Sequence, residues 1–558
     1  MTNSANAKKV LSDNLSMSRQ QRLEQIKTCQ SWDIIIIGGG IVGAGILKRA
    51  SQLGLKVLLV EQKDFAWGSS SRSSKMVHGG LRYIAEGKIA LTRESVQERE
   101  KLLKDAPLLV TKQSFAMSHY KKQFPWPWLF NTLLSIYDAI ADFSFTFKQH
   151  SFFSKNNYLL LVPGANEKTL VGGTQFFDAL TDDARLVQRL IQEALQLGAQ
   201  AINYCQVEKL TEQDKTITGV EVKTEEHDDT FLLTAKVVIN ATGAWSNKLL
   251  EKLVLDKNNS KALSPTTAPT FKMRPLRGSH LILPSWRLPV ASAISILHPV
   301  DNRPVQIYPW QNVTIVGTTD VEHLEPLMNE AKISTQEMNY LLNAVNCQFS
   351  QTNITEKDIL STFSGVRPVI DSGGYVAPSK EKREHSIYQQ AGLITVAGGK
   401  LTTFDLIAKQ VLTKVCDALN ATKPNFPHFV FEPSSITDLD SLPKLVQQQI
   451  FACYGGLSRE FYQQMKKSLL HNISYTKHLW AELVWAVKYE QIQHLDDLLL
   501  RRTRLGNVLP FGAADYLSKI KAICYQELGW SEEKWQQETC RYKKLWLQHY
   551  SLPAACKL

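Results

Sequence analysis

The 558-residue sequence has few cysteines and no long hydrophobic run. Its eight cysteines form no C-x-x-C pair and have no metal-ligand spacing, which indicates a reducing compartment and no metal site. They are Cys29, Cys205, Cys347, Cys416, Cys453, Cys524, Cys540 and Cys556. No run of about eighteen uncharged apolar residues occurs, so we expect no membrane-spanning segment. The N-terminal residues also lack the apolar core of a signal peptide.

Internal repeats, low-complexity tracts and an EF-hand loop are absent from the sequence as well. Hydrophobic residues make up 44% and charged residues 21% of the chain, as in ordinary globular proteins, and the length suffices for two or three domains. A net charge of +11 suits a nucleic acid, an anionic membrane surface or an anionic substrate. Because no RNP, KH or zinc-knuckle signature is present, we expect no nucleic-acid partner.

Residues 1–31 form a mildly basic leader, and Asp13 and Glu24 interrupt its charge pattern, which disfavours a transit peptide. Met17, Leu23 and Ile26 predict a short amphipathic helix. This helix either docks on the body of the protein, which we favour, or touches an external surface.

A βαβ unit follows at 33–61, where the sequence is DIIIIGGGIVGAGILKRASQLGLKVLLVE. The isoleucines at 34–37 predict a buried strand, the apolar spacing after the glycines predicts a helix, and the residues at 57–60 predict a second strand. The glycines match G-x-G-x-x-G, which supplies a tight turn, close approach of the backbone to a pyrophosphate, and close helix packing. The helix N-terminus then holds the phosphates.

Glu61 ends the second strand, where its carboxylate can accept two hydrogen bonds from an adenosine ribose and would repel a 2′-phosphate. NADP is therefore disfavoured. A glycine turn without a ligand is the plain alternative, but strand, helix and acidic residue together favour a dinucleotide site. The predicted cofactor residues of this unit are Gly38, Gly39, Gly40, Ile41, Val42, Gly43 and Glu61.

Small and hydroxyl residues dominate the segment FAWGSSSRSSKMVHGGLRY at 65–83. Ser70 and Ser74 are predicted to contact the pyrophosphate or a flavin ring; the alternative is a flexible serine loop. His78, Arg82 and Tyr83 follow at once, so a titratable group, a fork-shaped donor and a phenol lie beside the glycines.

Two later segments favour FAD over NAD. The first, TAKVVINATGAWS at 234–246, predicts a buried strand ending in Ala-Thr-Gly, as in flavoproteins with two dinucleotide-binding domains. The second, LITVAGGKLTTFDLIAKQVL at 393–412, predicts a strand, a glycine turn and a helix whose N-terminal dipole would favour a reduced flavin. The predicted cofactor residues here are Val207, Ala241, Thr242, Gly243, Gly398, Gly399, Leu401 and Thr402, and Lys400 is predicted to serve both flavin and substrate.

Helices are predicted at 91–109 and at 178–199, the latter capped by Thr181. The aromatic segment FPWPWLFNTLLSIYDAIADF at 124–143 is either an interfacial membrane element or a core helix. We favour the core helix because Asn131 and Asp138 interrupt the apolar face.

The predicted fold class is α/β, with a Rossmann-like FAD-binding domain, an inserted mixed β-sheet substrate domain and a C-terminal α-helical domain. The FAD-binding domain comprises 32–110, 178–255 and 366–415, the substrate domain comprises 111–177 and 256–365, and the helical domain comprises 425–558.

These motifs resemble the FAD-dependent glycerol-3-phosphate dehydrogenases of the aerobic, quinone-linked type. SSRSSKMVHGGLRY, DDARLV, INATGAW, RGSH, YPW with VGTTD, SGVRP, REHSI and VAGGKLTTF appear in that family's order, and RRTRLG at 501–506 resembles a motif of its C-terminal domain. The resemblance covers about 32–506. The sequence departs from the family's usual residues at Ala244, Phe404 and Asp405. None of these departures removes a proposed catalytic group.

The resemblance implies that FAD oxidises sn-glycerol 3-phosphate to dihydroxyacetone phosphate and that electrons pass to a membrane quinone. It also implies a cytoplasmic protein in peripheral contact with an anionic inner membrane, with a homodimer as one option. His78 is the expected base and His280 of RGSH the second candidate. The implied catalytic set is His78, Arg82, Tyr83, His280, Arg367, Arg383 and Lys400.

Two other functions stay open. A related flavin oxidase would use oxygen as acceptor or act on an amino acid, although an amino-acid substrate calls for a carboxylate clamp and an apolar pocket. A non-catalytic or RNA-associated flavoprotein is suggested by the positive charge alone, and salt-sensitive RNA binding would identify it.

Overall fold

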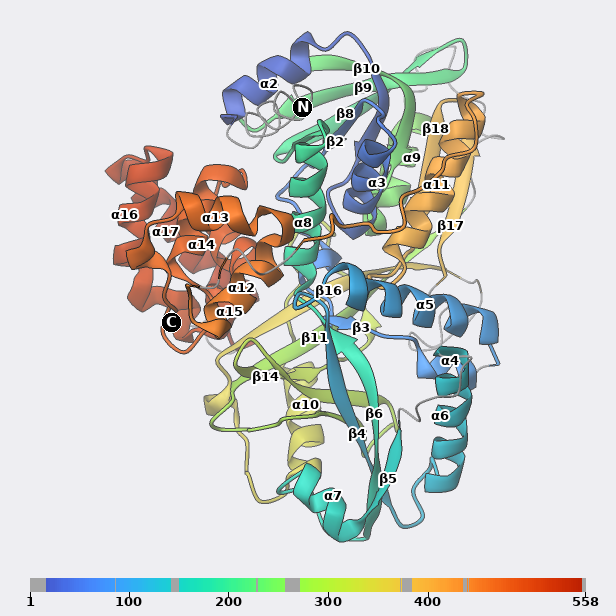
Figure 1. Cartoon of the computed structure of the whole chain (residues 1–558), viewed down its shortest axis with the longest axis vertical. Coiled ribbons are helices and arrows are strands. Elements are labelled where there is room, and N and C mark those ends of the chain that lie inside the picture. Colours follow the sequence, from blue (N-terminus) through green and yellow to red (C-terminus); the bar gives the residue numbers. More distant parts are fainter. Residues whose placement is uncertain are drawn as a thin grey trace.

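The structure is a computed structural model that describes residues 17–85, 87–141, 150–226, 229–255, 271–371, 373, 384–434, 439 and 441–553. Two β-sheets lie one beyond the other along the long axis, and the C-terminal helices pack against their junction from one side (Figure 1). This mixed α/β architecture with a separate helical segment confirms the predicted fold class.

The first sheet has a parallel centre made from three distant parts of the chain. Its strand order is β17 (Ser386–Gln390), β18 (Leu393–Ala397), β10 (Thr230–Asn240), β1 (Trp32–Ile37), β2 (Val57–Val60) and β7 (Gln200–Ile202), with β8 (Cys205–Gln213) and β9 (Thr216–Thr224) joined antiparallel to β10. Strands β1, β2, β7, β10 and β18 pair in parallel. The isoleucine strand β1 therefore lies inside the sheet, between β10 and β2.

Alternation along β1 divides its side chains between two cores. Ile34 and Ile36 pack with helices on one face, and these helices are α3 (Ile41–Gln52), α8 (Asp183–Gln196) and α11 (Phe404–Ala418). Ile35 and Ile37 face the hairpin β8–β9, α9 (Ser246–Leu255) and the N-terminal helix α2 (Arg19–Thr28). Both faces of β1 are buried, as expected for a strand of consecutive isoleucines in a parallel sheet.

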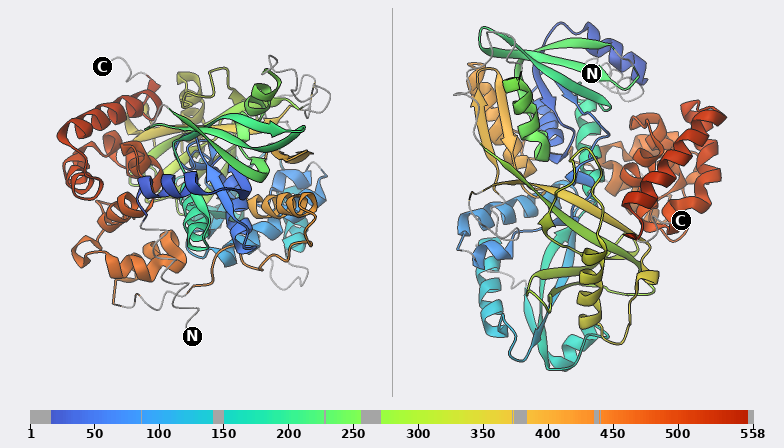
Figure 2. Two further views of the ribbon diagram at one scale, coloured as in Figure 1. Left: turned by 90° about the horizontal axis from the view of Figure 1, so that it is seen from above. Right: turned by 180° about the vertical axis from the view of Figure 1, so that it is seen from behind.

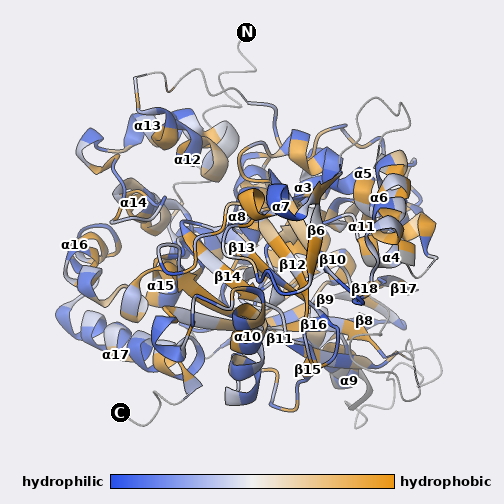
Figure 3. Ribbon diagram, turned by 90° about the horizontal axis from the view of Figure 1, so that it is seen from below, coloured by the Kyte–Doolittle hydropathy of each residue, from blue (hydrophilic) through white to orange (hydrophobic). Residues whose placement is uncertain are grey.

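The second sheet is mixed and mostly antiparallel. Its order is β15 (Val321–Glu322), β11 (Met273–Pro284), β14 (Val313–Gly317), β13 (Pro304–Trp310), β12 (Ala293–Leu297), β4 (Thr111–Tyr120), β6 (Leu170–Leu180) and β3 (Met76–Val77), with β16 (Ser361–Ile370) on β11 and β5 (Ser151–Ser154) on β6. Helices α10 (Thr335–Gln348) and α7 (Lys155–Leu161) pack on one face. Strands at the centre of the view from below are largely hydrophobic (Figure 3).

The C-terminal segment is helical and lies on the opposite side of the molecule from β17, β18 and α11 (Figure 2). Its α-helices are α12 (Lys444–Tyr454), α13 (Ser458–Gln464), α14 (Trp480–Tyr489), α15 (Leu505–Val508), α16 (Leu517–Leu528) and α17 (Glu532–His549). A π-helical turn at Asp497–Arg502 precedes α15. Leucines of this turn and tryptophans of the helices share a core with the inner face of the second sheet.

Buried ion pairs join the helical segment to the first sheet, and we call them the ionic junction. Arg501 Nε and Arg502 Nη1 both bind Asp64 Oδ2 at 2.6 Å. Arg504 Nη2 binds Asp182 Oδ1 at 2.8 Å. Since burying a charge is costly unless it is paired, these matched carboxylates explain how the arginines of RRTRLG lie in the interior.

Three local expectations can be compared with the structure. The N-terminal helix docks on the body as favoured, with Leu23 and Ile26 buried. The helix expected at 178–199 starts at Asp183, and its cap is Asp182 instead of Thr181, because the Asp182 carboxylate accepts a hydrogen bond from the amide of Arg185 at 3.1 Å. In the described ranges we find no helix of the length and apolarity needed to cross a bilayer.

The predicted charged helix is α5 (Ile89–Asp105), and α4 (Leu81–Ala85) precedes it. The aromatic segment forms α6 (Pro127–Ala141), which packs beside α4 and α5. Only one side of α6 belongs to the core: Leu134 and Tyr137 are buried, whereas Trp128 is 65% exposed. The expectation of a core helix is therefore correct for one face and wrong for the other.

Candidate functional site

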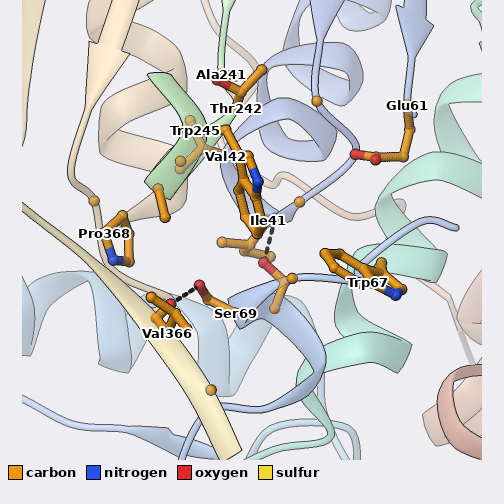
Figure 4. A pocket seen from close by; sticks show the side chains of 18 of the residues that line it. Ile41, Val42, Glu61, Trp67, Ser69, Ala241, Thr242, Trp245, Val366 and Pro368 are labelled. Carbon is orange, nitrogen blue, oxygen red and sulfur yellow. Dashed lines mark hydrogen bonds between the residues drawn. The ribbon is translucent and has the colours of Figure 1, made fainter. Parts of the chain in front are cut away.

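A cavity of about 570 Å³ lies at the carboxyl ends of the parallel strands, facing the second sheet (Figure 4). Ile37 at the end of β1, Ala241 just after β10 and Gly398 just after β18 line it. In open α/β sheets this edge is where ligands bind. The volume falls within the range of roughly 300–1,000 Å³ that is usual for ligand pockets.

The glycine turn is built by close contacts that exclude side chains. Gly38 has φ +111°, and a Cβ there would lie 2.7 Å from the carbonyl oxygen of Ala241. A Cβ on Gly43 would lie 1.9 Å from the carbonyl oxygen of Gly38, so this glycine lets α3 approach the turn. Gly40 is the N-cap of α3 and lines the cavity. Two glycines are thus required by the fold, and the third lies where a ligand would approach.

Glu61 is held by backbone amides at the end of β2. Its Oε2 accepts a hydrogen bond from the amide of Gly39 at 2.7 Å, and Oε1 accepts one from the amide of Lys63 at 2.9 Å. Burial raises the pKa of Glu61 in spite of these hydrogen bonds. Because a carboxylate offers about four lone-pair sites, it retains capacity for the two ribose hydroxyls.

The serine-rich segment wraps the cavity as a short 3₁₀ turn, Ser69–Ser71. Ser70 Oγ accepts a hydrogen bond from the amide of Ile41 at 3.0 Å, and Ser69 Oγ donates to the carbonyl oxygen of Val366 on β16 (Figure 4). This segment therefore ties the glycine turn of the first sheet to the second sheet. These two contacts identify it as an ordered part of the cavity wall, against the alternative of a flexible serine loop.

His280 lies on β11 at the second-sheet side of the cavity. Its ring stacks on Phe363 with centroids 4.4 Å apart, and Nε2 lies 2.9 Å from Ser74 Oγ. Burial, followed by the charges of Lys75 and Arg367, lowers the pKa of His280 well below 6.5. The imidazole is therefore neutral at neutral pH.

Arg367 on β16 also lines the cavity, and its guanidinium is fixed on one side. Nη1 donates to Asp320 Oδ1 at 2.6 Å, and Nη2 donates to Thr318 Oγ1 at 3.3 Å. A Cβ on Gly278 would lie 2.8 Å from Nη2, so glycine at this position makes room for the arginine. Arg303 shares Asp320, with its Nη2 3.4 Å from Oδ2. Arg303 and Arg367 thus share one carboxylate, that of Asp320.

Lys400 follows β18 and lies at the same end of the molecule as the HGGLRY segment. Its Nζ lies 4.1 Å above the ring centroid of Tyr83, a cation–π contact. The amide of His78 donates to Thr402 Oγ1 at 3.3 Å. These contacts place residues 78–83 and 400–402 side by side, although more than 300 residues separate them in the sequence.

Most of the predicted cofactor residues line the cavity: Gly38, Gly40, Ile41, Val42, Glu61, Ser70, Ser74, Val207, Ala241, Thr242, Gly243, Gly398, Gly399 and Leu401. Among the predicted catalytic residues, His280, Arg367 and Lys400 line it. Gly39, Gly43, Thr402, His78 and Tyr83 lie in the adjoining segments and do not line it. Arg82 lies in α4, and Arg383 lies outside the described residues.

Several lining residues received no role from the sequence. Trp67 and Trp245 both line the cavity, with ring centroids 5.8 Å apart. Trp67 belongs to the serine-rich segment and Trp245 to INATGAW, and the sequence pointed to both motifs. An indole next to a glycine turn was therefore the signal that could have predicted these two lining residues. Lys248 and Met328 also line it, and no local pattern marks them.

The cavity fits FAD. The N-terminus of α3 offers backbone amides and a positive dipole for a pyrophosphate, Glu61 offers acceptors for a ribose, and the turn at 398–401 precedes the N-terminus of α11. In the part of the chain that the structure describes, no group of three His, Cys, Asp or Glu side chains could hold a metal ion.

The sequence matches two protein families. Residues 33–411 match the family described as FAD dependent oxidoreductase, and residues 396–535 match the C-terminal domain of alpha-glycerophosphate oxidase. Aerobic glycerol-3-phosphate dehydrogenase of Staphylococcus aureus is 29% identical over 514 residues, which covers 88% of this chain and 89% of that protein. These matches confirm the resemblance that the sequence motifs indicated.

Two solved structures share the fold. Glycerol-3-phosphate dehydrogenase from Bacillus halodurans, complexed with FAD, has a TM-score of 0.73 and 23% identity, covering 95% of this chain and 97% of that one. L-alpha-glycerophosphate oxidase from Mycoplasma pneumoniae, with FAD bound, has a TM-score of 0.56 and 17% identity, covering 73% and 100%. With the cavity and its glycine turn, these findings show that the chain belongs to the family of FAD-dependent oxidoreductases and is an enzyme whose cofactor is FAD.

Proposed function

We propose that this enzyme oxidises sn-glycerol 3-phosphate to dihydroxyacetone phosphate. The relatives at 29% identity carry that activity in their name. One observation carries the proposal to this chain: Arg367 and Lys400 line the same cavity as the glycine turn, so cations suited to a phosphate lie within the cofactor cavity.

The cofactor supplies a hydride acceptor, flavin N5, when it is bound. The chain's own residues supply the remaining requirements. The turn at 38–43 and Glu61 are proposed to hold the dinucleotide half, and the turn at 398–402 is proposed to hold the flavin end at the N-terminus of α11. This proposal assigns FAD to the first sheet and the substrate to the second, along the domain division expected from the sequence.

The phosphate is proposed to bind Arg367, with Arg82 and Arg383 as further donors. Asp320 holds one side of the Arg367 guanidinium at 2.6 Å, which fixes the direction of the group. An arginine held in this way loses little conformational entropy when it binds an oxyanion. Lys400, which stacks on Tyr83, is proposed to contact the substrate oxygen.

The substrate hydroxyl must lose its proton as the carbon loses a hydride, and His78 is proposed to accept that proton. His280 is the second candidate, because it lines the cavity. Burial and two neighbouring cations lower the pKa of His280, so its ring binds a proton weakly. This weakness supports His78 as the base and leaves His280 to orient a hydroxyl as a neutral ring.

We propose membrane quinone as the electron acceptor, with the enzyme in the cytoplasm and in peripheral contact with an anionic inner membrane, and a homodimer as one option. Oxygen is the second candidate acceptor, because the C-terminal segment matches the corresponding domain of an oxidase. Oxygen consumption with peroxide release, measured beside reduction of a quinone analogue, separates the two acceptors.

The experiment that tests the oxidation is anaerobic mixing of purified enzyme with glycerol 3-phosphate. Flavin absorbance should bleach, and one dihydroxyacetone phosphate should form for each flavin. An unphosphorylated glycerol control should bleach it far more slowly. Flavin that stays oxidised with glycerol 3-phosphate but bleaches with an amino acid would overturn the proposal.

A further inference from the structure

Three exposed aromatic side chains form a continuous ridge at the start of α6. Phe124, Trp126 and Trp128 are 61%, 51% and 65% exposed. The centroids of the Phe124 and Trp126 rings lie 6.1 Å apart, and the two tryptophan rings stack with centroids 6.0 Å apart. We call these three residues the aromatic ridge. Grouped exposed aromatics of this kind mark an interaction surface, whereas single exposed ones are ordinary.

Two polar residues of α6, Asn131 and Asp138, turn away from the ridge. Asn131 Nδ2 donates to Pro127 O at 2.6 Å and to Thr174 Oγ1 on β6 at 3.2 Å. Asp138 pairs with His150 at 2.6 Å. In the sequence analysis these two residues were the reason to disfavour an interfacial membrane helix, because they interrupt the apolar face. Since they face the body of the protein, they do not interrupt the outer edge of α6.

Three lysines surround the ridge. Lys121 and Lys122 directly precede it, and Lys168 joins them because the amide of Lys121 donates to the carbonyl oxygen of Thr169 at 2.8 Å. All three lysines are exposed. Within the described ranges none of their ammonium groups has an acidic side chain at ion-pair distance, whereas nearby Lys155 is paired with Glu167 at 3.0 Å. The ridge therefore has a positive border.

A cavity of about 310 Å³ opens beside the ridge. Its wall includes Phe124 of the ridge, apolar groups of β4, β12 and α10, and the lysines 121 and 168. The apolar members are Met117, Ile296, Leu297, Pro299 and Ala344. Polar groups share the wall with them, among them Ser118, His119, Asn166 and Gln348, so the cavity has a mixed lining with cations and the ridge supplies the apolar surface.

This combination is the chemistry of a bilayer interface. Tryptophan sits at headgroup depth, and lysines near it attract anionic lipid. A protein partner would instead be expected to meet a ridge with a mixed polar rim. Trp286 offers the contrast: it is 65% exposed too, but it meets one tyrosine, Tyr475, edge to face at 5.2 Å and belongs to no such cluster.

We propose that the aromatic ridge, with Lys121, Lys122 and Lys168, docks this enzyme on an anionic bilayer. The inference rests on the proposed function, which calls for an acceptor dissolved in a membrane. It adds which surface of the protein contacts the membrane and that this surface binds anionic phospholipid.

The position of α6 links this surface to the substrate end of the flavin cavity. Tyr137, about two and a half turns along α6 from Trp128, receives a hydrogen bond from Arg99 Nη1 at 2.7 Å. A Cβ on Gly79 would lie 2.1 Å from its hydroxyl, so α6 lies against the residue that follows His78. In Figure 1, α6 runs from the end of the second sheet up to α4. A bilayer under its outer edge thus extends toward residues 78–83.

Vesicle sedimentation of the full FAD-loaded chain tests the proposal. We expect binding to vesicles of phosphatidylcholine with phosphatidylglycerol and much weaker binding to phosphatidylcholine alone. Trp126→Ala with Trp128→Ala should reduce the affinity at least about tenfold, whereas Trp286→Ala should leave it unchanged. Equal affinities of these two variants would overturn the docking surface.

The charge arm uses matched triple substitutions. Lys121→Glu, Lys122→Glu and Lys168→Glu together should abolish the preference for phosphatidylglycerol; the control is the same change at Lys466, Lys543 and Lys544 on the C-terminal segment. An equal loss in both triples would show that net charge alone is responsible. Competition by inorganic phosphate at constant ionic strength would show a free-anion site and overturn the lipid assignment.

All variants should bleach with glycerol 3-phosphate at the parent rate in solution. That readout tests the proposed function by itself, so failure of the surface and failure of the function are distinguishable.

Discussion

The ionic junction and the flavin cavity both contain buried or half-buried cations, and they differ in how these are balanced. In the junction, the one guanidinium of Arg501 contacts three carboxylates. They are Asp64 at 2.6 Å, Asp496 at 2.7 Å and Asp497 at 2.6 Å. Among the described residues, the cavity lining contains four cations and one carboxylate, that of Glu61, and the carboxylates of Glu330 and Asp320, which pair with two of these cations, lie behind the lining. The cations are Arg72, Lys248, Arg367 and Lys400. Charges that are balanced inside the protein hold elements together, whereas an excess of one sign is suited to a ligand of the other.

The largest expected effect is loss of the cofactor from the cavity with the junction intact. Gly40→Val places a branched side chain where the pyrophosphate approaches, so we expect protein that purifies without FAD. Absorbance at the flavin bands measures this. Circular dichroism should show a folded chain, since Gly40 makes none of the close contacts of Gly38 and Gly43. Normal flavin content would contradict the assignment of the turn.

Asp64→Asn breaks the junction in turn. Both Arg501 and Arg502 lose the carboxylate that they share, and two buried guanidinium groups are left short of charge. We expect the free energy of unfolding to fall by about 3–5 kcal/mol, measured by denaturant titration. Lys236→Ala is the control, because the Lys236 side chain is 60% exposed and its pair with Asp33 should contribute less than about 1 kcal/mol. Similar losses in both variants would refute the contrast.

Replacement of the histidines sharpens the assignment of roles within the cavity. His78→Asn should slow flavin reduction by about a hundredfold or more and remove the acidic limb of the rate profile, with FAD still bound. His280→Asn should slow the reaction less and keep that limb. Stopped-flow absorbance across pH measures both, and the reverse pattern would move the base to His280.

The C-terminal segment also predicts a pH dependence, at His494, which contacts Glu225 and Glu538. Burial lowers the pKa of this ring, but its contacts with Glu225 and Glu538 outweigh burial and raise it to about 9. The folded state therefore keeps a proton that the unfolded state loses above about 6.5. The resulting stability is complete below that pH and is lost as pH rises through about 9. Against His494→Gln, the parent should lose roughly 2 kcal/mol more between neutral pH and alkaline pH. If the free energy of unfolding depended on pH in the same way in both proteins, this prediction would be contradicted.

The smallest expected effect is Arg367→Lys in the cavity. Lysine keeps the charge but loses the planar fork, so we expect binding of glycerol 3-phosphate to weaken about tenfold, while stability stays nearly unchanged. Titration of the reduced flavin fraction against substrate measures this. Unphosphorylated glycerol, a poor substrate, should be indifferent to the change; equal losses on both substrates would show that Arg367 does not hold phosphate.

Local patterns predicted the cofactor half of the site. The spacing of Gly38, Gly40 and Gly43 and the position of Glu61 after a strand are set by contacts within about thirty residues, so the sequence displays them directly. The cap of α8 was misassigned to Thr181 because both it and Asp182 can cap a helix, and only the backbone geometry chooses between them.

Contacts between distant segments were not predictable in the same way. Asp64 and Arg501 are 437 residues apart, and no pattern near either residue announces the other. RRTRLG was noted only through its resemblance to a family motif. The outer edge of α6 was missed for a related reason, because the partners of Asn131 and Asp138, on β6 and at His150, decide which side of the helix faces inward.

The order of strands in the first sheet constrains how the chain folds during translation. Strand β1 leaves the ribosome early, but its neighbour β10 is complete only at Asn240, and β18, which pairs with β10, ends at Ala397. At ribosomal rates of about 5–20 residues per second, the residues between the end of β10 and the end of β18 take roughly 8–30 s to emerge. Through that interval the edge of β10 is an unpaired hydrophobic template, a state in which nascent chains aggregate. The cavity closes only when residues 398–401 emerge, so FAD is the ligand of a nearly finished protein and cannot guide the assembly of its first half.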